Sequence, residues 1–217
     1  MESKSDRICP VCSNLALPRL KKGNTQYWQC VSCRMLYCDP IEQEHLVGGG
    51  AEYERNTEQN HLRIERVDTL CKGRRKEDVH ILDAGCGHGL LIKDLRDAGY
   101  PNVDGWDAYN PEYSRLPEKN KYDVVTCVEM IEHTSFSYPE VDVMFRALKN
   151  NAWLYIETSF TSVAEEENIP LEEFSYIAPD WGHTSIFSHH ALDVLMVGRG
   201  FKIGRHTNRH VRNFYKP

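Results

Sequence analysis

Short apolar runs and longer amphipathic stretches alternate along residues 79–215, and the two kinds of segment predict different elements. A short run rich in β-branched or aromatic residues favours a buried strand. A stretch whose apolar residues recur every three or four positions favours a helix. The pattern therefore predicts strands at residues 79–83, 102–107, 122–129, 152–159, 201–206 and 210–215, and helices at residues 89–99, 139–150 and 188–200.

Strands and helices that alternate in this way are typical of one fold class. They predict an α/β protein with a mostly parallel sheet and helices on both of its faces. Ligands of such sheets bind beyond the carboxyl ends of the strands, where the strand order reverses. The polar residues that follow each predicted strand are therefore the first candidates for a site.

The first 38 residues have a different pattern, because five of the eight cysteines lie there. Two C-x-x-C pairs, "CPVC" and "CVSC", are separated by seventeen residues. Two tight turns of this kind aim four thiolates at one point, and Zn²⁺ accepts that tetrahedral set. We expect a zinc ribbon, with a redox dithiol and a rubredoxin-like iron site as alternatives. The predicted zinc ligands are Cys9, Cys12, Cys30 and Cys33, and Cys38 is expected to be a buried residue outside the set.

A site with four protein ligands has no open position for a substrate, so the ribbon is expected to be a structural staple rather than a platform for a substrate or partner. Three consecutive glycines, Gly48–Gly50, follow it and predict a hinge. The next amphipathic stretch, residues 52–73, predicts a helix. The predicted segments are a zinc ribbon at residues 1–47, a hinge with a lid-like helix at residues 48–74, and a main domain at residues 75–217.

Composition narrows the class of protein. Hydrophobic residues make up 41% of the chain and charged residues 27%, as in ordinary globular proteins. No apolar run approaches the roughly 20 residues that cross a bilayer, and the first residues lack the apolar core of an export signal. We therefore expect a cytoplasmic protein without a membrane partner. The net charge of −6 argues against a broad nucleic-acid surface.

The segment "DAGCGHG", which starts at Asp83, indicates a ligand that approaches the backbone closely. Gly85 and Gly87 accept positive φ, and the helix that follows offers unpaired N–H groups. A P-loop would need Gly-Lys-Ser/Thr, which is absent here. A dinucleotide site would need its third glycine where Leu90 stands. S-Adenosylmethionine, which has a carboxylate but no pyrophosphate, is the remaining ligand.

With this motif, residues 75–205 resemble the class I S-adenosylmethionine-dependent methyltransferases. The resemblance implies a Rossmann-like domain in which Asp83 and the glycine turn hold the methionine end. It also implies an acidic residue after the second strand that holds the ribose hydroxyls. Asp107 stands there, with Asp104 as a weaker rival, and an Asx turn before Asn110 is its alternative role. The resemblance places the cofactor against Asp83, Gly85, Cys86, Gly87, Gly89, Asp107, Ala108 and Glu129.

The chain departs from this family at one place. Its members normally have a helix, a third strand and another helix between the ribose carboxylate and the fourth strand. Only fifteen residues separate Asp107 from Asp123, which is too few for those elements. We expect a loop or a single short turn instead, so the sheet is abbreviated around its third strand. Tyr109 and Leu116 are candidates for adenine contacts by position.

The segment "CVEMIEH" begins within the last residues of the strand predicted at residues 122–129 and continues beyond it. Glu129, Glu132 and His133 have the i, i+3, i+4 spacing that one helical turn places on one face. The segment is similar to that of the ubiquinone-pathway O-methyltransferases and of the small-RNA 3′-end methyltransferases, where such residues can bind a divalent cation. The resemblance thus implies a Mg²⁺ or Mn²⁺ site as one role. A proton acceptor or an active-site wall is the other role, and we favour it.

The segment "PDWGHTSIFSHHAL" resembles the loop before the last helix of the family. The resemblance places His183 at the acceptor pocket as a base, a metal ligand or a hydrogen-bonded loop residue. Ser188 is predicted to cap the helix, and Tyr176 and Trp181 are candidates for the pocket wall. The predicted catalytic residues are His133, His183 and Glu129, and a divalent ion would be held by Glu129, Glu132, His133 and His183.

These features predict an enzyme that transfers a methyl group from S-adenosylmethionine to an oxygen or nitrogen of a small or carrier-bound metabolite, by in-line displacement. One alternative is a metal-assisted RNA or DNA methyltransferase. Another is a non-catalytic protein that binds the cofactor or a partner. The helix after the hinge and the 159–180 segment are expected to close over the site.

Overall fold

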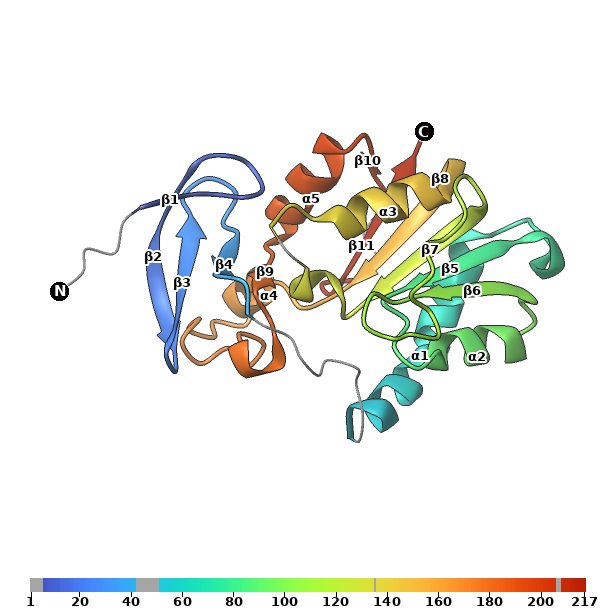
Figure 1. Ribbon diagram of the computed structural model, residues 1–217, viewed down its shortest axis with the longest axis horizontal. Helices are drawn as coiled ribbons and strands as arrows, with labels where there is room; N and C mark the ends of the chain where they lie inside the picture. Colours follow the sequence, from blue (N-terminus) through green and yellow to red (C-terminus); the bar gives the residue numbers. More distant parts are fainter. Residues whose placement is uncertain (1–5, 42–50, 135, 206–207) are drawn as a thin grey trace.

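Two β-sheets organise the protein, and Figure 1 shows them side by side. The computed structural model describes residues 6–41, 51–134, 136–205 and 208–217, with the backbone alone for residues 51–58. Within these ranges the larger sheet has six strands in the order β10-β11-β8-β7-β5-β6. Their bounds are His80–Ala84 (β5), Asn102–Trp106 (β6), Tyr122–Val128 (β7), Leu148–Glu157 (β8), Lys202–Ile203 (β10) and Val211–Lys216 (β11).

The four strands at one side of the larger sheet, β6, β5, β7 and β8, are parallel. β11 runs antiparallel to β8, and β10 runs antiparallel to β11. This arrangement confirms the predicted fold class and the predicted final strand pair. Because parallel strands end at the same edge of a sheet, the residues that follow β5, β6, β7 and β8 come together there.

Alternate residues of the strands pack into two cores, because successive side chains point to opposite faces of a sheet. Ile81 and Val124 belong to one core, and Leu82 and Val125 belong to the other. The helices α1 (Ala51–Leu70) and α2 (Leu90–Asp97) pack on the first face, and α3 (Pro139–Ala147) and α5 (His189–Gly198) pack on the second (Figure 1).

The strand β6 is an edge of the larger sheet, as the short connection after Asp107 predicts. Among the described residues, the stretch between β6 and β7 contains turns and no helix or strand. Tyr113 from this stretch packs against the core that α1 and α2 cover. The expectation of a loop in place of the third strand is therefore confirmed.

The smaller sheet is built mostly from the first 38 residues, in the order β1-β2-β3-β4-β9. Its last strand, β9, comes from the loop before α5, and it pairs antiparallel with β4 through Leu36–Ile186 and Tyr37–Ser185. The sequence did not predict this pairing. The bounds are Arg7–Ile8 (β1), Leu15–Lys22 (β2), Thr25–Cys30 (β3), Leu36–Cys38 (β4) and Ser185–Ile186 (β9).

Some predicted element bounds agree with the structure, and others differ from it or lie outside the described residues. The helix predicted at residues 52–73 is confirmed as α1, whereas the hinge at Gly48–Gly50 lies outside the described residues. The helix predicted at residues 139–150 ends earlier, because β8 already begins at Leu148. Ser188 accepts a hydrogen bond from the Ala191 N–H, so the predicted helix cap is confirmed. No helix of the described part of the chain has the length and apolarity that a membrane crossing requires.

The acidic stretch at residues 165–173 is only partly exposed. Helix α4 (Thr161–Glu166) enters it, and Leu171 is buried. Leu171 and Ile177 pack with Tyr27 and Leu36 of the smaller sheet. The apolar residues between the glutamates anchor this segment against the ribbon, which composition alone does not reveal.

Candidate active site

The glycine turn after β5 has the backbone that the motif predicts. Gly85, Gly87 and Gly89 have φ values of 76°, 53° and 77°. A Cβ at Gly85 would lie 2.4 Å from Met130 Cγ, and a Cβ at Gly89 would lie 2.6 Å from Tyr113 Oη. A Cβ at Gly87 would meet no atom within 4 Å. Gly87 is therefore the glycine whose surface is open to a ligand.

Asp83 lies at the carboxyl end of β5 and is buried. Thr126 on the neighbouring strand donates a hydrogen bond of 2.7 Å to its Oδ1 atom. Burial raises the pKa of Asp83 to about 6, although the Thr126 hydroxyl and the charge of Arg63 lower it. The structure thus places this carboxyl group beneath the glycine turn, in surroundings that disfavour its charge.

Asp107 follows β6 and reaches across to the glycine turn. Its Oδ2 atom accepts a hydrogen bond of 2.9 Å from the Gly87 N–H. Its Oδ1 atom accepts hydrogen bonds from the N–H groups of Tyr109 and Asn110, at 2.8 and 3.0 Å. The Asx turn weighed as its alternative role is thus present. Because a carboxylate oxygen can accept more than one hydrogen bond, the turn leaves capacity for a ligand hydroxyl.

Other residues predicted at the cofactor are placed differently. Asp104 accepts a hydrogen bond from Tyr122 and pairs with Lys121, so it holds two strands together. The Cys86 side chain packs with the α2 core, its N–H donates to the Trp106 carbonyl oxygen, and its own carbonyl oxygen accepts from the Gly89 N–H. The remaining candidates, Ala108, Tyr109 and Leu116, are exposed in the loop after β6.

A cavity of about 380 Å³ lies at the carboxyl ends of β7 and β8, beneath α1. Both segments expected to close over the site contribute to it: Arg63 comes from α1, and Tyr176 comes from the 159–180 segment. The predicted catalytic residue Glu129 lines it as well. The lining residues are Gln59, Leu62, Arg63, Arg66, Glu129, Glu157, Ser159, Tyr176, Asn208 and His210.

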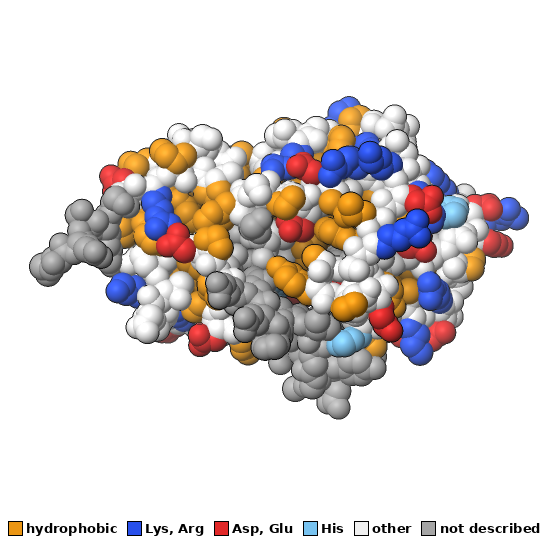
Figure 2. Space-filling model, viewed as in Figure 1, with side chains coloured by type: hydrophobic (Ala, Val, Ile, Leu, Met, Phe, Trp, Pro, Cys, Tyr) orange, Lys and Arg blue, Asp and Glu red, His pale blue; other side chains and the backbone are white. Residues whose placement is uncertain are grey.

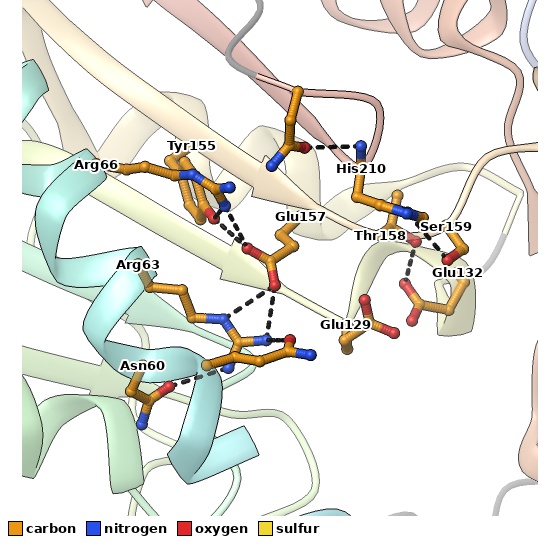
Figure 3. A network of polar contacts seen from close by, with 12 residues as sticks. Asn60, Arg63, Arg66, Glu129, Glu132, Tyr155, Glu157, Thr158, Ser159 and His210 are labelled. Atoms are coloured by element: carbon orange, nitrogen blue, oxygen red, sulfur yellow. Dashed lines mark hydrogen bonds and ion pairs between the residues drawn. The ribbon is translucent and has the colours of Figure 1, made fainter. Parts of the chain in front are cut away.

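Two arginines of α1 converge on Glu157, the last residue of β8 (Figure 3). Arg63 donates from Nε and Nη2 to Glu157 Oε1, at 3.0 and 2.7 Å. Arg66 donates to Glu157 Oε2 at 3.1 Å, and the Tyr155 hydroxyl donates to the same atom. Asn60 accepts a further hydrogen bond from Arg63. Sequence reasoning missed this network, although Glu157 ends a parallel strand as Asp83 does.

Tyr176 links the two glutamates of the E-x-x-E-H segment. Its hydroxyl oxygen lies 3.0 Å from Glu129 Oε2 and also contacts Glu132 Oε1, so the two carboxyl groups share its single donor proton. Thr158 donates to the other oxygen of Glu132 at 3.0 Å. Burial and the charge of Glu132 raise the pKa of Glu129 to about 8, and burial also raises the pKa of Glu132. Both effects favour the neutral form of Glu129.

His133 and His183 lie together, with ring centroids 4.8 Å apart. His133 Nδ1 is 3.2 Å from the Gly182 carbonyl oxygen, and His183 Nδ1 is 2.7 Å from that of Tyr176. A carbonyl accepts only from a protonated nitrogen, so Nδ1 carries the proton in each neutral ring. Each Nε2 atom then presents a lone pair.

Ligand atoms of Glu132, His133 and His183 all lie within 4.8 Å of one another, so these three residues could hold a metal ion. Glu129 is outside this set, contrary to the expectation of one helical face. Its φ of 47° breaks the turn, and the short 3-10 helix begins only at Ile131. The set contains one carboxylate and two imidazoles, which suits a transition metal better than Mg²⁺.

The four predicted zinc ligands converge in the ribbon. Their sulfur atoms lie within 4.8 Å of one another, with Cys9–Cys33 at 3.6 Å and Cys12–Cys30 at 3.4 Å. A zinc–sulfur bond of about 2.3 Å implies sulfur separations of about 3.8 Å in a tetrahedron. The hydrogen bond between the two thiols lowers the pKa of Cys9 and raises that of Cys33, and the sulfur positions decide the assignment. The cluster therefore fits a zinc ion, while Cys38 is buried elsewhere as expected.

A family model described as a methyltransferase domain matches residues 53–206. The chain belongs to the methyltransferase family. The matched residues include most of α1, the glycine turn, most of the cavity lining and β9. The ribbon lies before the matched region.

Two curated relatives of this methyltransferase are named ubiquinone biosynthesis O-methyltransferase. That of Nitrosomonas europaea is 26% identical over 149 residues, which are 55% of this chain and 63% of the relative. That of Hydrogenovibrio crunogenus is 29% identical over 122 residues, 46% of this chain and 49% of the relative. The chain thus spans about half the length of the curated relatives it matches.

Two solved structures resemble the methyltransferase in fold. A candidate O-methyltransferase of Nostoc punctiforme has a TM-score of 0.56 at 14% identity, covering 76% of this chain and 58% of its own. A complex of the Haloferax volcanii Trm112 methyltransferase activator with a candidate methyltransferase has a TM-score of 0.54 at 14% identity. The likeness covers 76% of this chain and 80% of the matched chain. At this identity the likeness shows the fold alone.

Proposed function

We propose that the protein transfers the methyl group of S-adenosylmethionine to a hydroxyl or amino group of a small or carrier-bound metabolite. The observation that carries the proposal is the cavity at the carboxyl ends of β7 and β8, because the parallel strand β5, which the glycine turn follows, ends at the same edge of the sheet. The named relatives act in ubiquinone biosynthesis as O-methyltransferases, which favours a hydroxyl as the acceptor.

The donor supplies an electrophilic methyl carbon, and the acceptor lone pair attacks it in line while the carbon–sulfur bond breaks. The residues of this chain have three tasks: to align the reactants, to exclude water and to take the acceptor proton. The glycine turn and Asp107 would hold the donor. The Nε2 lone pair of His133 or His183 would accept the proton. In each ring the Nδ1 proton stays on Nδ1, because it is hydrogen-bonded to a backbone carbonyl oxygen.

The charges of the cavity support an acceptor with an anionic group. Arg63 and Arg66 line it with Glu157, and burial raises the pKa of Glu129, which favours its neutral form. The cavity lining therefore carries more positive than negative charge. Elsewhere, the face in Figure 2 mixes charges of both signs at the α2 and β6 end and shows hydrophobic side chains over the ribbon. Such a face gives little support to the alternative of a nucleic-acid acceptor.

The test is a turnover assay with the full chain, in which S-adenosylhomocysteine is measured by mass spectrometry. The acceptors are a panel of small phenols, amines and carboxylate-bearing hydroxyl compounds. We expect turnover with a hydroxyl compound and a loss of about 100-fold or more for a double His133→Asn, His183→Asn variant if these rings supply the base. Full activity of the double variant would remove the histidines from the mechanism. Turnover of an oligonucleotide alone would favour the alternative.

A further inference from the structure

The ribbon and the histidine pair are connected through β9. This strand completes the ribbon sheet by pairing with β4, at Leu36–Ile186 and Tyr37–Ser185. His183 and Thr184 directly precede β9 in the chain. The candidate catalytic histidine is therefore positioned by a strand that, within the described part of the chain, pairs with the ribbon strand β4 alone.

Two ribbon residues hold the backbone at His183 directly. The hydroxyl of Tyr27, on β3, donates a hydrogen bond of 2.6 Å to the His183 carbonyl oxygen. The N–H of Cys38, at the end of β4, donates to the Thr184 carbonyl oxygen at 3.0 Å. Tyr27 and Cys38 are both fully buried, so water cannot replace these contacts without disruption of the core.

The same segment holds the E-x-x-E-H turn. The Thr184 N–H donates to the Glu132 carbonyl oxygen at 3.0 Å, and the Thr184 hydroxyl donates to the Thr134 carbonyl oxygen at 3.3 Å. A movement of Thr184 would therefore displace the turn that carries Glu132 and His133. The contacts form a continuous path from the ribbon to both candidate histidines.

The other end of β9 is tied to the cysteine cluster itself. The Ser188 hydroxyl donates to the carbonyl oxygen of Cys33 at 2.7 Å. The same oxygen of Ser188 accepts from the Ala191 N–H at 3.0 Å and so begins α5. A change in the backbone of the second C-x-x-C pair would thus reach the helix cap and the end of β9.

The geometry points to a positioning role for the zinc ribbon: we propose that metal binding at the four cysteines orders β4 and Tyr27, which hold His183 and the Glu132 turn in place. The ion supplies no chemistry to methyl transfer, because its four ligands come from the ribbon. The assignment of His183 to the active site rests on the proposed function. The contacts with the ribbon do not, so the readouts below require no turnover.

The test compares two tyrosine-to-phenylalanine variants of the full chain. Tyr27→Phe removes the hydrogen bond to His183. Tyr37→Phe is the matched control, because its buried hydroxyl donates to the Ile8 carbonyl within the ribbon. Zinc content and the hydrogen exchange rate of the Thr184 N–H are measured in each variant. The ring ¹⁵N spectrum of His183 reports which nitrogen carries its proton.

We expect both variants to retain zinc. In Tyr27→Phe alone, the Thr184 N–H should exchange about three- to tenfold faster, the effect of one lost hydrogen bond. The ring ¹⁵N spectrum of His183 should then show both neutral forms, one with the proton on Nδ1 and one with the proton on Nε2. Exchange that is unchanged in Tyr27→Phe, or equally faster in Tyr37→Phe, would overturn the proposal.

Zinc removal from the wild-type chain is the second measurement, and it needs no variant to fold. Chelation that empties the four cysteines should speed exchange at Thr184 as well as within the ribbon, while Val125 in the centre of β7 stays protected. Faster exchange confined to the ribbon would contradict the coupling. If the coupling is observed but no acceptor is methylated, this inference stands and the proposed function is rejected.

Discussion

Arg63 on α1 and Glu157 at the end of β8 form a buried ion pair, with Nη2 and Oε1 2.7 Å apart. The side chains are 3% and 10% exposed. The pair joins the helix above the cavity to the sheet below it, and Arg66 and Tyr155 complete the hydrogen bonding of the carboxylate (Figure 3). The position of α1 over the cavity therefore depends on this contact.

Replacement of Arg63 by alanine should destabilise the protein strongly, because it leaves the Glu157 carboxylate buried with one fewer cationic partner. Loss of one partner of a buried pair costs about 3–5 kcal/mol, and Arg66 should keep the loss near the lower figure. Urea unfolding measures the change. The matched control is Lys93→Ala, which breaks the exposed pair with Asp97 on α2 and should cost about 0.5 kcal/mol or less. Similar losses in the two variants would contradict the role of the buried pair.

Asp83 should make the ligand-free protein less stable as the pH rises. Its folded pKa of about 6 lies above the ordinary value of 3.8, so between these values the folded state keeps a proton that the unfolded state has released. Stability should therefore fall through this window, by up to about 3 kcal/mol, and level off above pH 6. Asp83→Asn, which keeps the acceptor for Thr126, should remove this dependence.

Urea unfolding at pH 4, 5, 6 and 7 compares the two proteins. Thr126→Val is a second control, because it removes the hydroxyl that lowers the pKa of Asp83 and should extend the fall to higher pH. A constant difference between wild type and Asp83→Asn across this range would show that the carboxyl group does not change protonation there.

Short sequence motifs predicted the parts of the site that neighbouring residues form. The glycine turn, the strand ends at Asp83 and Asp107 and the two C-x-x-C pairs each depend on residues close together in the chain. The spacing argument failed at Glu129, because helical periodicity assumes a helical backbone and this residue has a φ of 47°.

Contacts between distant segments could not be predicted in the same way. Arg63 and Glu157 are 94 residues apart, and nothing in the apolar pattern of α1 indicates the partner of an inward arginine. The pairing of β4 with β9 brings Leu36 to Ile186, and β9 is too short to show an alternating pattern. Tertiary packing decides both contacts, so the cavity network and the docking of the ribbon emerged only from the structure.

The ribbon should bind one zinc ion per chain, since the four sulfur atoms fit one tetrahedral site. Metal analysis of protein purified without chelator should give about one zinc per chain. Cys30→Ser should lower this value, whereas Cys71→Ser, which changes a buried cysteine of the core that α1 and α2 cover, should not. Protein that carries iron or no metal would contradict the zinc assignment.

Methyl transfer should not depend on added Mg²⁺ or Mn²⁺. Glu132 already accepts hydrogen bonds from Tyr176 and Thr158, and Glu129 is outside the set of Glu132, His133 and His183. Once the ribbon is loaded with zinc, turnover should be equal within about twofold with and without either ion, as expected for a proton acceptor rather than a Lewis acid. Restoration of an inactive enzyme by Mn²⁺ would contradict this prediction and assign the cluster to a metal.

Calorimetric titration with S-adenosylmethionine tests the central claim most directly, because it asks whether the glycine turn and Asp107 form the donor site. We expect one binding site per chain in the wild type. Asp107→Ala should weaken binding by about 10-fold or more through loss of hydrogen bonds to a charged group, and Asp104→Ala should leave the affinity almost unchanged. No binding heat with the wild type, or equal affinity in Asp107→Ala and the wild type, would contradict the account.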